Sequence, residues 1–173
     1  MAKAIGIVVA VVVAAFLILA ATKPDTFRVQ RSMIIQAPPA KVHALIDDFD
    51  RWQSWSPWEK KDAAMKRTRS GPASGVGAVY SWESKEVGCG RMEIVESTPA
   101  AVRIKLDFTA PLEAHNVAEF VLTQEGEATR VTWTMRGPNS YLAKMVQTVL
   151  DMDHIVGKDF EAGLASLKSL TEG

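Results

Sequence analysis

The ionisable and nucleophilic side chains of this sequence form no established catalytic or metal-binding pattern. His43, His115 and His154 are far apart, and neither a His-x-x-x-His nor a Cys-x-x-Cys pairing is present. Zinc sites usually take their ligands from such short spacings, so no metal site is predicted. Cys89 is the single cysteine, which permits no internal disulfide, and no neighbour in the sequence would activate its thiol.

Acid/base chemistry would have to come from the carboxylates and the histidine near the centre of a predicted sheet. Asp107 and Glu119 alternate with apolar neighbours, and His115 begins a strand. The alternation predicts that both carboxylates face solvent. If the sheet curled so that one pointed inwards, burial would raise its pKa and make it an acid/base candidate.

Glycine pairs that could bind phosphate are found only ahead of predicted strands. Residues 75–77 and 88–90 both read Gly-x-Gly, whereas phosphate loops precede the N-terminus of a helix. We therefore predict no cofactor.

Aromatic residues give the clearest indication of a binding site. Trp52, Trp55 and Trp58 fall within one short segment. Indoles line apolar pockets and offer one N–H that can orient a ligand, but they can equally seal a core, and Trp55 is expected to be structural. We predict a cavity with Trp52 or Trp58 at its rim. The candidate ligand-binding residues are Trp52, Trp58, Tyr80, Trp82, Leu106, Phe108, Phe120 and Met135.

The elements that would position these residues are mostly strands. Residues 27–35 mix β-branched and aromatic residues with polar ones, and a helix at 40–46 follows Pro38 and Pro39. Shorter strands are predicted at 65–69, 78–83 and 91–96. Runs at 102–109, 118–123 and 130–136 alternate apolar and polar residues, which is typical of half-buried strands. Short turns between them favour an antiparallel meander with one dry face.

A long C-terminal helix is predicted to cover that face, which makes the fold class α+β. From residue 141 the apolar residues recur three or four apart, and Gly157 suggests a bend or break within 151–157. Trp133 is expected to be core beneath this helix. The predicted apolar stripe comprises Leu142, Met145, Val149, Val156, Phe160, Leu164 and Leu167.

Three segments within these elements carry a resemblance to a known superfamily. They are the Ala-Pro-Pro helix start followed by the tryptophan cluster at 37–58, Thr-Arg-Val-Thr-Trp at 129–133, and Gly-Lys-Asp-Phe-Glu-Ala-Gly-Leu at 157–164. The chain resembles the START-like (SRPBCC, helix-grip) superfamily in its bacterial polyketide cyclase/dehydrase and lipid-transport-like branch, over about residues 27–170. The resemblance implies a curved antiparallel sheet wrapped around a long C-terminal helix, with an apolar pocket between them. Members bind, transport or transform different hydrophobic compounds, so it selects no activity.

Residues 1–23 are predicted to form an N-terminal transmembrane anchor ahead of one domain at 24–173. Residues 4–22 carry no charge and as a helix would be about 28 Å long, close to the ~30 Å hydrocarbon core of a bilayer. A cleaved signal peptide stays open, although its apolar segment is usually shorter and the residues at 19–22 match a small-x-small cleavage site poorly. A buried core helix is the third alternative. Lys3 and the amino terminus favour a domain outside the cytoplasm, whereas Lys23 and the arginines after it oppose that orientation.

Charge and composition narrow the function further. Lysine plus arginine equals aspartate plus glutamate, at 20 each, and without a basic stripe a nucleic-acid partner is not predicted. Three hypotheses remain: a membrane-anchored domain that binds a lipid or other small hydrophobic ligand, a polyketide cyclase/dehydratase-like enzyme with a cavity acid/base residue, or a structural domain without a void. An enzyme needs convergent polar groups in its cavity, whereas a carrier needs an apolar lining. The missing catalytic set favours the binder, and no protein partner is indicated.

Overall fold

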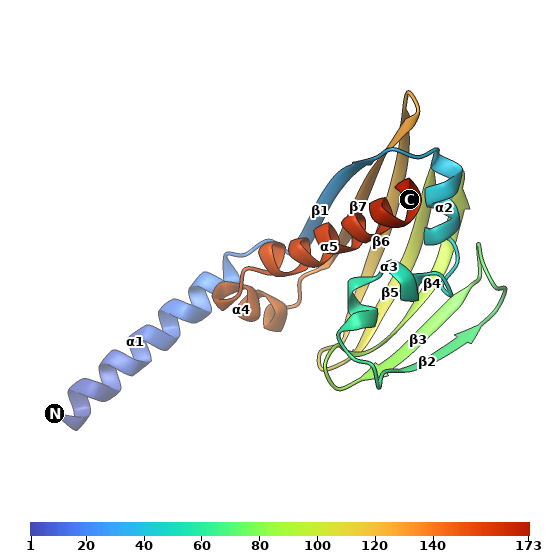
Figure 1. Ribbon diagram of the computed structural model, residues 1–173. Helices are drawn as coiled ribbons and strands as arrows, with labels where there is room; N and C mark the ends of the chain where they lie inside the picture. Colours follow the sequence, from blue (N-terminus) through green and yellow to red (C-terminus); the bar gives the residue numbers. More distant parts are fainter.

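One curved antiparallel sheet of seven strands, in the order β1-β7-β6-β5-β4-β3-β2, organises the molecule. The computed structural model describes residues 1–173 (Figure 1). The strands are β1 (Thr26–Ile35), β2 (Lys66–Ser70), β3 (Val79–Ser84), β4 (Gly88–Thr98), β5 (Ala101–Ala110), β6 (Ala114–Glu125) and β7 (Ala128–Pro138). The helices are α1 (Ala2–Ala21), α2 (Pro39–Ile46), α3 (Trp52–Trp55), the 3-10 helix η1 (Pro57–Lys60), α4 (Tyr141–Val149) and α5 (Met152–Glu172).

The concave face of the sheet carries the alternating apolar residues that the sequence predicts. Ile104 on β5, Phe120 on β6 and Val131 on β7 are all fully buried, and β5, β6 and β7 pair in sequence as a meander. Helix α5 crosses the hollow of the sheet (Figure 1) and buries Phe160 and Leu164 there. This arrangement confirms the α+β helix-grip fold.

The structure confirms a break in the C-terminal helical region, but Gly157 is not its cause. The break falls between α4 and α5, where Leu150 is extended and the Asp151 carboxylate caps α5 by accepting a hydrogen bond from the His154 N–H at 3.0 Å. Gly157 lies inside α5 and is buried. The Arg31 guanidinium lies where a side chain at residue 157 would be. Gly157 therefore makes room for a neighbour and does not end a helix.

The predicted apolar stripe is also wrong in its first part. Phe160, Leu164 and Leu167 on α5 are at most 1% exposed, whereas Leu142 and Val149 on α4 are 47% and 74% exposed. The reason is the break, which turns α4 away from the hollow of the sheet and places it along α1.

The N-terminal helix α1 projects away from the domain (Figure 1). It is long and apolar enough to cross a membrane. Ala20 is its one buried residue, so α1 does not contribute a helix to the domain core. Its last turns pack against α4, and residues 22–25 lead from it into β1.

Candidate functional site

An apolar cavity lies between α5 and the concave face of the sheet. Its volume is about 160 Å³, and 14 of its 16 lining residues are hydrophobic. The lining comprises Trp52, Ser56, Trp58, Glu59, Met65, Tyr80, Trp82, Val87, Met92, Leu106, Phe108, Ala118, Trp133, Met135, Val156 and Phe160. We call this space the inner cavity.

All of the predicted ligand-binding residues except Phe120 line the inner cavity. Phe120 is fully buried and lies behind the lining, with its ring centroid 4.7 Å from that of Trp133 and 6.0 Å from that of Trp55. Alternation grouped Phe120 with Ala118 and Leu122, and all three are buried, but it could not show that tryptophan rings cover Phe120. A ligand-binding role for the others stays a prediction.

The clustered tryptophans divide into two kinds. Trp52 and Trp55 are at most 4% exposed, and their indole N–H groups donate to the carbonyl oxygens of Ile46 and Leu45 at 2.9 Å each. They therefore pin α3 beneath the end of α2. Trp58 is only half-buried and meets Trp133 edge-on at a centroid distance of 5.6 Å. Of the two predicted rim residues, the geometry suits Trp58, while Trp52 is part of the core wall.

Trp133 is the central ring of the inner cavity. It stacks on Phe160 with centroids 4.1 Å apart and an interplanar angle of 4°, as expected for a core residue beneath the helix. Gly163 permits this approach, because a Cβ there would lie 2.8 Å from the indole ring. The indole Nε1 of Trp133 is buried and has no hydrogen-bond partner. A buried N–H without a partner carries a desolvation cost of about 1–3 kcal/mol, which an acceptor on a ligand would remove.

Trp82 forms another wall and owes its place to Gly90. The two residues pair across β3 and β4, and a Cβ at residue 90 would lie 2.5 Å from the indole of Trp82. The missing side chain lets the indole lie across β4, where it meets the ring of Phe108 edge-on at 5.6 Å.

A polar group that the sequence did not reveal closes one wall of the inner cavity. The Glu59 side chain is 6% exposed and accepts a hydrogen bond from Arg67 Nε at 2.7 Å and another from the Tyr80 hydroxyl. Burial, and then the Glu59 carboxylate, raise the pKa of Tyr80 well above its ordinary value. The hydrogen bond to Glu59 raises the pKa of Arg67 as well. Tyr80 is therefore neutral, and its hydroxyl donates a hydrogen bond to the Glu59 carboxylate.

The carboxylates considered from the sequence lie on the opposite, convex face. Asp107 accepts a hydrogen bond from His115 Nδ1 at 2.7 Å, and Glu119 pairs with Arg103 at 2.8 Å. Burial is the largest influence on Asp107 and raises its pKa, but hydrogen bonds from His115 and Lys105 outweigh it and leave the pKa below its ordinary value. Neither Asp107 nor Glu119 lines the inner cavity, in agreement with the predicted outward direction. No group of three or more His, Cys, Asp or Glu residues is arranged to hold a metal.

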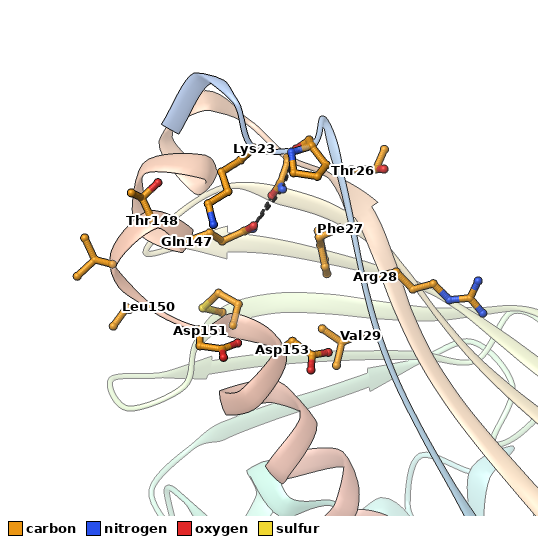
Figure 2. Close-up of a pocket in the computed structure, with 14 residues that line it drawn as sticks. Lys23, Thr26, Phe27, Arg28, Val29, Gln147, Thr148, Leu150, Asp151 and Asp153 are labelled. Carbon is orange, nitrogen blue, oxygen red and sulfur yellow. Dashed lines mark hydrogen bonds between the residues drawn. The ribbon is translucent and has the colours of Figure 1, made fainter. Parts of the chain in front are cut away.

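A second and more open space, which we call the outer groove, lies where α1 joins the domain. It has a volume of about 610 Å³ and runs between residues 23–29 and residues 147–153. Phe27 and Val29 point from β1 towards the start of α5, while Arg28 points away (Figure 2). Met152 lines the outer groove and Val156 lines the inner cavity, so a single turn of α5 separates the two spaces.

Comparisons with known proteins agree with this architecture. Three solved structures that share the fold are protein CV1439 from Chromobacterium violaceum, the Aha1 dimer from Colwellia psychrerythraea, and the di-domain ARO/CYC protein BexL from the BE-7585A biosynthetic pathway. CV1439 is 16% identical with a TM-score of 0.60, covering 87% of this chain and 99% of that protein. The Aha1 protein is 17% identical with a TM-score of 0.60, covering 84% and 96%. BexL is 14% identical with a TM-score of 0.64, covering 90% of this chain and 53% of BexL.

At these identities the structural likeness establishes the fold alone, and no curated protein matches the chain. The family is established by the sequence itself. Residues 26–172, which include the whole sheet and both C-terminal helices, match the family model described as polyketide cyclase / dehydrase and lipid transport. The chain therefore belongs to the polyketide cyclase / dehydrase and lipid transport family.

Proposed function

We propose that this protein is a membrane-anchored domain that binds a small hydrophobic molecule bearing one hydrogen-bond acceptor in its inner cavity. The observation that carries the proposal is the unpaired indole N–H of Trp133 in a lining of which 14 of 16 residues are hydrophobic. Ligand sites of this kind combine a hydrophobic wall with a few polar groups that fix orientation. A ketone, quinone or ester oxygen would satisfy the N–H.

The size of the inner cavity limits what it can hold without change. At about 160 Å³ it is comparable to the ~150 Å³ engineered cavity that binds benzene. One aromatic ring with a small substituent fits. A lipid chain requires Trp58 or Val156 to move, and both are only partly buried. The family description includes lipid transport, which supports a larger ligand after such movement.

The membrane anchor is supported by the exposure of α1 and by the charges around it. All of α1 except Ala20 is accessible. Arg31 is paired with Asp153 at 3.0 Å and with Glu161 at 2.8 Å, and Arg28 bonds Gln30. The amino terminus and Lys3 lie at the start of α1, whereas only Lys23 closely follows its end, because Arg28 and Arg31 lie in β1 of the folded domain. The proposed topology keeps the amino terminus in the cytoplasm and the domain outside it.

A cyclase or dehydratase activity is the second candidate, and the buried Glu59 favours it. This carboxylate lines the inner cavity, and ARO/CYC proteins share the fold. Both of its oxygens, however, already accept hydrogen bonds, one from Arg67 and one from Tyr80. A general base must reach the proton that it removes, and Glu59 would first have to leave these donors. The geometry therefore favours binding over catalysis.

The decisive experiment compares two probes of the same shape, acetophenone and α-methylstyrene, which differ by a carbonyl oxygen. Their affinities are measured by calorimetric titration of the full-length protein in lipid nanodiscs. A neutral hydrogen bond contributes about 0.5–1.5 kcal/mol, so Trp133→Phe should lower the preference for acetophenone over α-methylstyrene by about 2–13-fold. The hydrocarbon probe controls for any change in packing. An unchanged ratio would remove Trp133 from the proposal.

The contribution of the rim is tested with a matched pair of tryptophan substitutions. Trp58→Ala should weaken probe binding while the protein stays folded, because Trp58 is half-buried. Trp52→Ala should lower the free energy of unfolding by about 3–5 kcal/mol, as truncation of a large core aromatic does. It also leaves the Ile46 carbonyl without its hydrogen-bond donor. Destabilisation by both substitutions, with unchanged affinity per folded molecule, would show that the cluster is packing alone.

The anchor itself is tested by fractionation and by sequencing the mature protein. The full-length protein should remain with carbonate-washed membranes and retain its first residues. A mature N-terminus within residues 22–25 would instead identify α1 as a cleaved signal peptide.

A further inference from the structure

Helix α4 is amphipathic, but its polar side faces the domain and its apolar side faces away, the opposite of a helix that covers a core. Its polar residues face the domain: Lys144 is 8% exposed and pairs with Asp25 at 2.5 Å, and Gln147 exchanges hydrogen bonds with Asn139. The side chain of Ser140 caps the first turn by accepting from the Ala143 N–H at 3.2 Å. The domain therefore holds α4 through polar contacts.

The apolar residues of α4 point away from those contacts. Leu142 and Val149, seven residues apart and so on one side of the helix, are 47% and 74% exposed. Tyr141 and Leu150 at the two ends are 46% exposed each. Isolated exposed apolar residues are ordinary on soluble proteins, but a cluster on one short helix marks a surface that is covered by something else.

The position of α4 along α1 indicates what covers it. The Tyr141 hydroxyl donates to the backbone carbonyl of Leu17 at 2.9 Å, and α4 packs against the end of α1 where Ala20 is buried. Leu17 precedes Ala21, the last residue of α1, by about 6 Å along the helix axis at ~1.5 Å per residue. Amphipathic helices at membrane interfaces bury their apolar face by about 5–10 Å. A tyrosine at this depth suits the interfacial aromatic belt.

We propose that α4 lies in the interface of the same bilayer that α1 crosses, with Leu142 and Val149 at the boundary of the acyl chains. This inference rests on the proposed membrane anchor, since α1 sets the depth. It goes beyond anchoring because it fixes how the domain sits on the membrane. The outer groove, whose wall includes Val149 and Leu150, then opens at the level of the lipid headgroups. The inner cavity lies one turn of α5 away, so its ligand site is held beside the bilayer surface.

Depth-dependent quenching tests this placement on the full-length protein. In a Cys89→Ser background, an environment-sensitive fluorophore is attached at Leu142→Cys, Val149→Cys, Val9→Cys or Glu127→Cys, and the protein is reconstituted into phosphatidylcholine vesicles with or without nitroxide-labelled lipid. Val9 lies inside α1 and reports on the anchor, while Glu127 lies in the β6–β7 turn at the far end of the sheet. We expect the fluorophores at 142 and 149 to be blue-shifted and to lose fluorescence almost as at 9, with little loss at 127.

The outcomes separate this inference from the anchor on which it rests. Quenching at 9 but only background loss at 142 and 149 would overturn the interfacial placement of α4 and leave the anchor intact. A blue shift at 142 and 149 without quenching by the labelled lipid would show that protein, and not bilayer, covers α4. Absence of quenching at 9 would overturn the anchor together with this inference, whereas binding of the ketone probe by the inner cavity would still be measurable.

Discussion

Replacing Phe160 with alanine should strongly destabilise the domain, because this ring fills the space between α5 and the sheet. Phe160 is 1% exposed and stacks on Trp133 at 4.1 Å. Truncation of a core aromatic costs about 3–5 kcal/mol, and more where the surroundings cannot collapse. Here Trp133 is held on its other sides by Phe120 and Trp55, so we expect about 4–5 kcal/mol. That is a large share of the ~5–15 kcal/mol stability of a typical domain.

Urea unfolding of the full-length protein in nanodiscs, followed by tryptophan fluorescence, measures this loss. With a denaturant slope of ~2 kcal/mol per molar urea, the midpoint should fall by about 2 M. Lys168→Ala is the control on the same helix. Its amine is bonded to the Ile34 carbonyl at 3.0 Å and to Glu172 at 3.2 Å, and an exposed pair of this kind contributes only about 0.3–0.5 kcal/mol.

The lost ring should also leave a larger void that a small molecule can fill. At ten times its dissociation constant, a bound molecule restores about 1.4 kcal/mol. Benzene should therefore raise the midpoint of Phe160→Ala more than that of Lys168→Ala, whose inner cavity keeps its original size. Similar midpoints for the two variants, or equal responses to benzene, would refute the assignment of Phe160 to the wall of the inner cavity.

Three further predictions concern charge and packing. Hydrogen bonding to Asp107 raises the pKa of His115. The NMR titration midpoint of His115 should therefore lie above about pH 6.5, and it should fall in the Asp107→Asn variant. The stabilisation of the fold by protonated His115 is present below about pH 6.5 and is lost as the pH rises through the raised pKa. Burial raises the pKa of Tyr80. Neutral Tyr80 therefore stabilises the fold fully up to about pH 10, and this stabilisation is lost as the pH rises further, through the raised pKa. Tyr80→Phe should remove the slow part of the tyrosine absorbance change in strong alkali, which accompanies unfolding. In urea unfolding, Gly157→Ala should fall short of the ~1 kcal/mol that Gly→Ala usually gains inside a helix, because the new methyl group displaces the Arg31 guanidinium. In an Arg31→Ala background Gly157→Ala should recover this gain; additive effects of the two substitutions would contradict the proposed clash.

The sheet was predictable from the sequence because one dry face imposes a period of two on each strand. That rule correctly oriented Asp107 and Glu119 outwards and Leu106 and Trp133 inwards. Whether a residue on the inner face reaches the cavity or lies behind other side chains was not predictable, because this depends on which rings overlap in space. Phe120 shares the inner face with Trp133, yet tryptophan rings separate it from the cavity.

The polar group in the inner cavity escaped prediction for a different reason. Glu59 directly follows the tryptophan cluster and precedes two lysines, and Arg67 stands in a predicted strand rich in basic residues. Each looks like a surface residue alone. Their pairing brings both side chains to 21% exposure or less, and burial of a charge depends on a partner that local sequence does not display.

Helix α4 shows the same limit in reverse. Its apolar residues continue the spacing of those on α5, so periodicity assigned them to one stripe. The break at Leu150 and Asp151 redirects the chain. In addition, the amphipathic pattern of a helix does not show whether its apolar side packs on a protein core or on lipid.

The short connection between α1 and β1 limits how far this domain can travel. Residues 22–25 would span at most about 14 Å when fully extended, which is less than the ~15 Å radius of gyration of a domain of ~150 residues. Asp25 is further held by the Asn139 N–H, which donates to its carbonyl at 2.7 Å. With α1 in a bilayer, the domain cannot swing out to meet a second membrane. Under the proposed anchoring, the inner cavity would exchange its ligand with the adjacent leaflet, and passage across an aqueous gap would require a separate carrier.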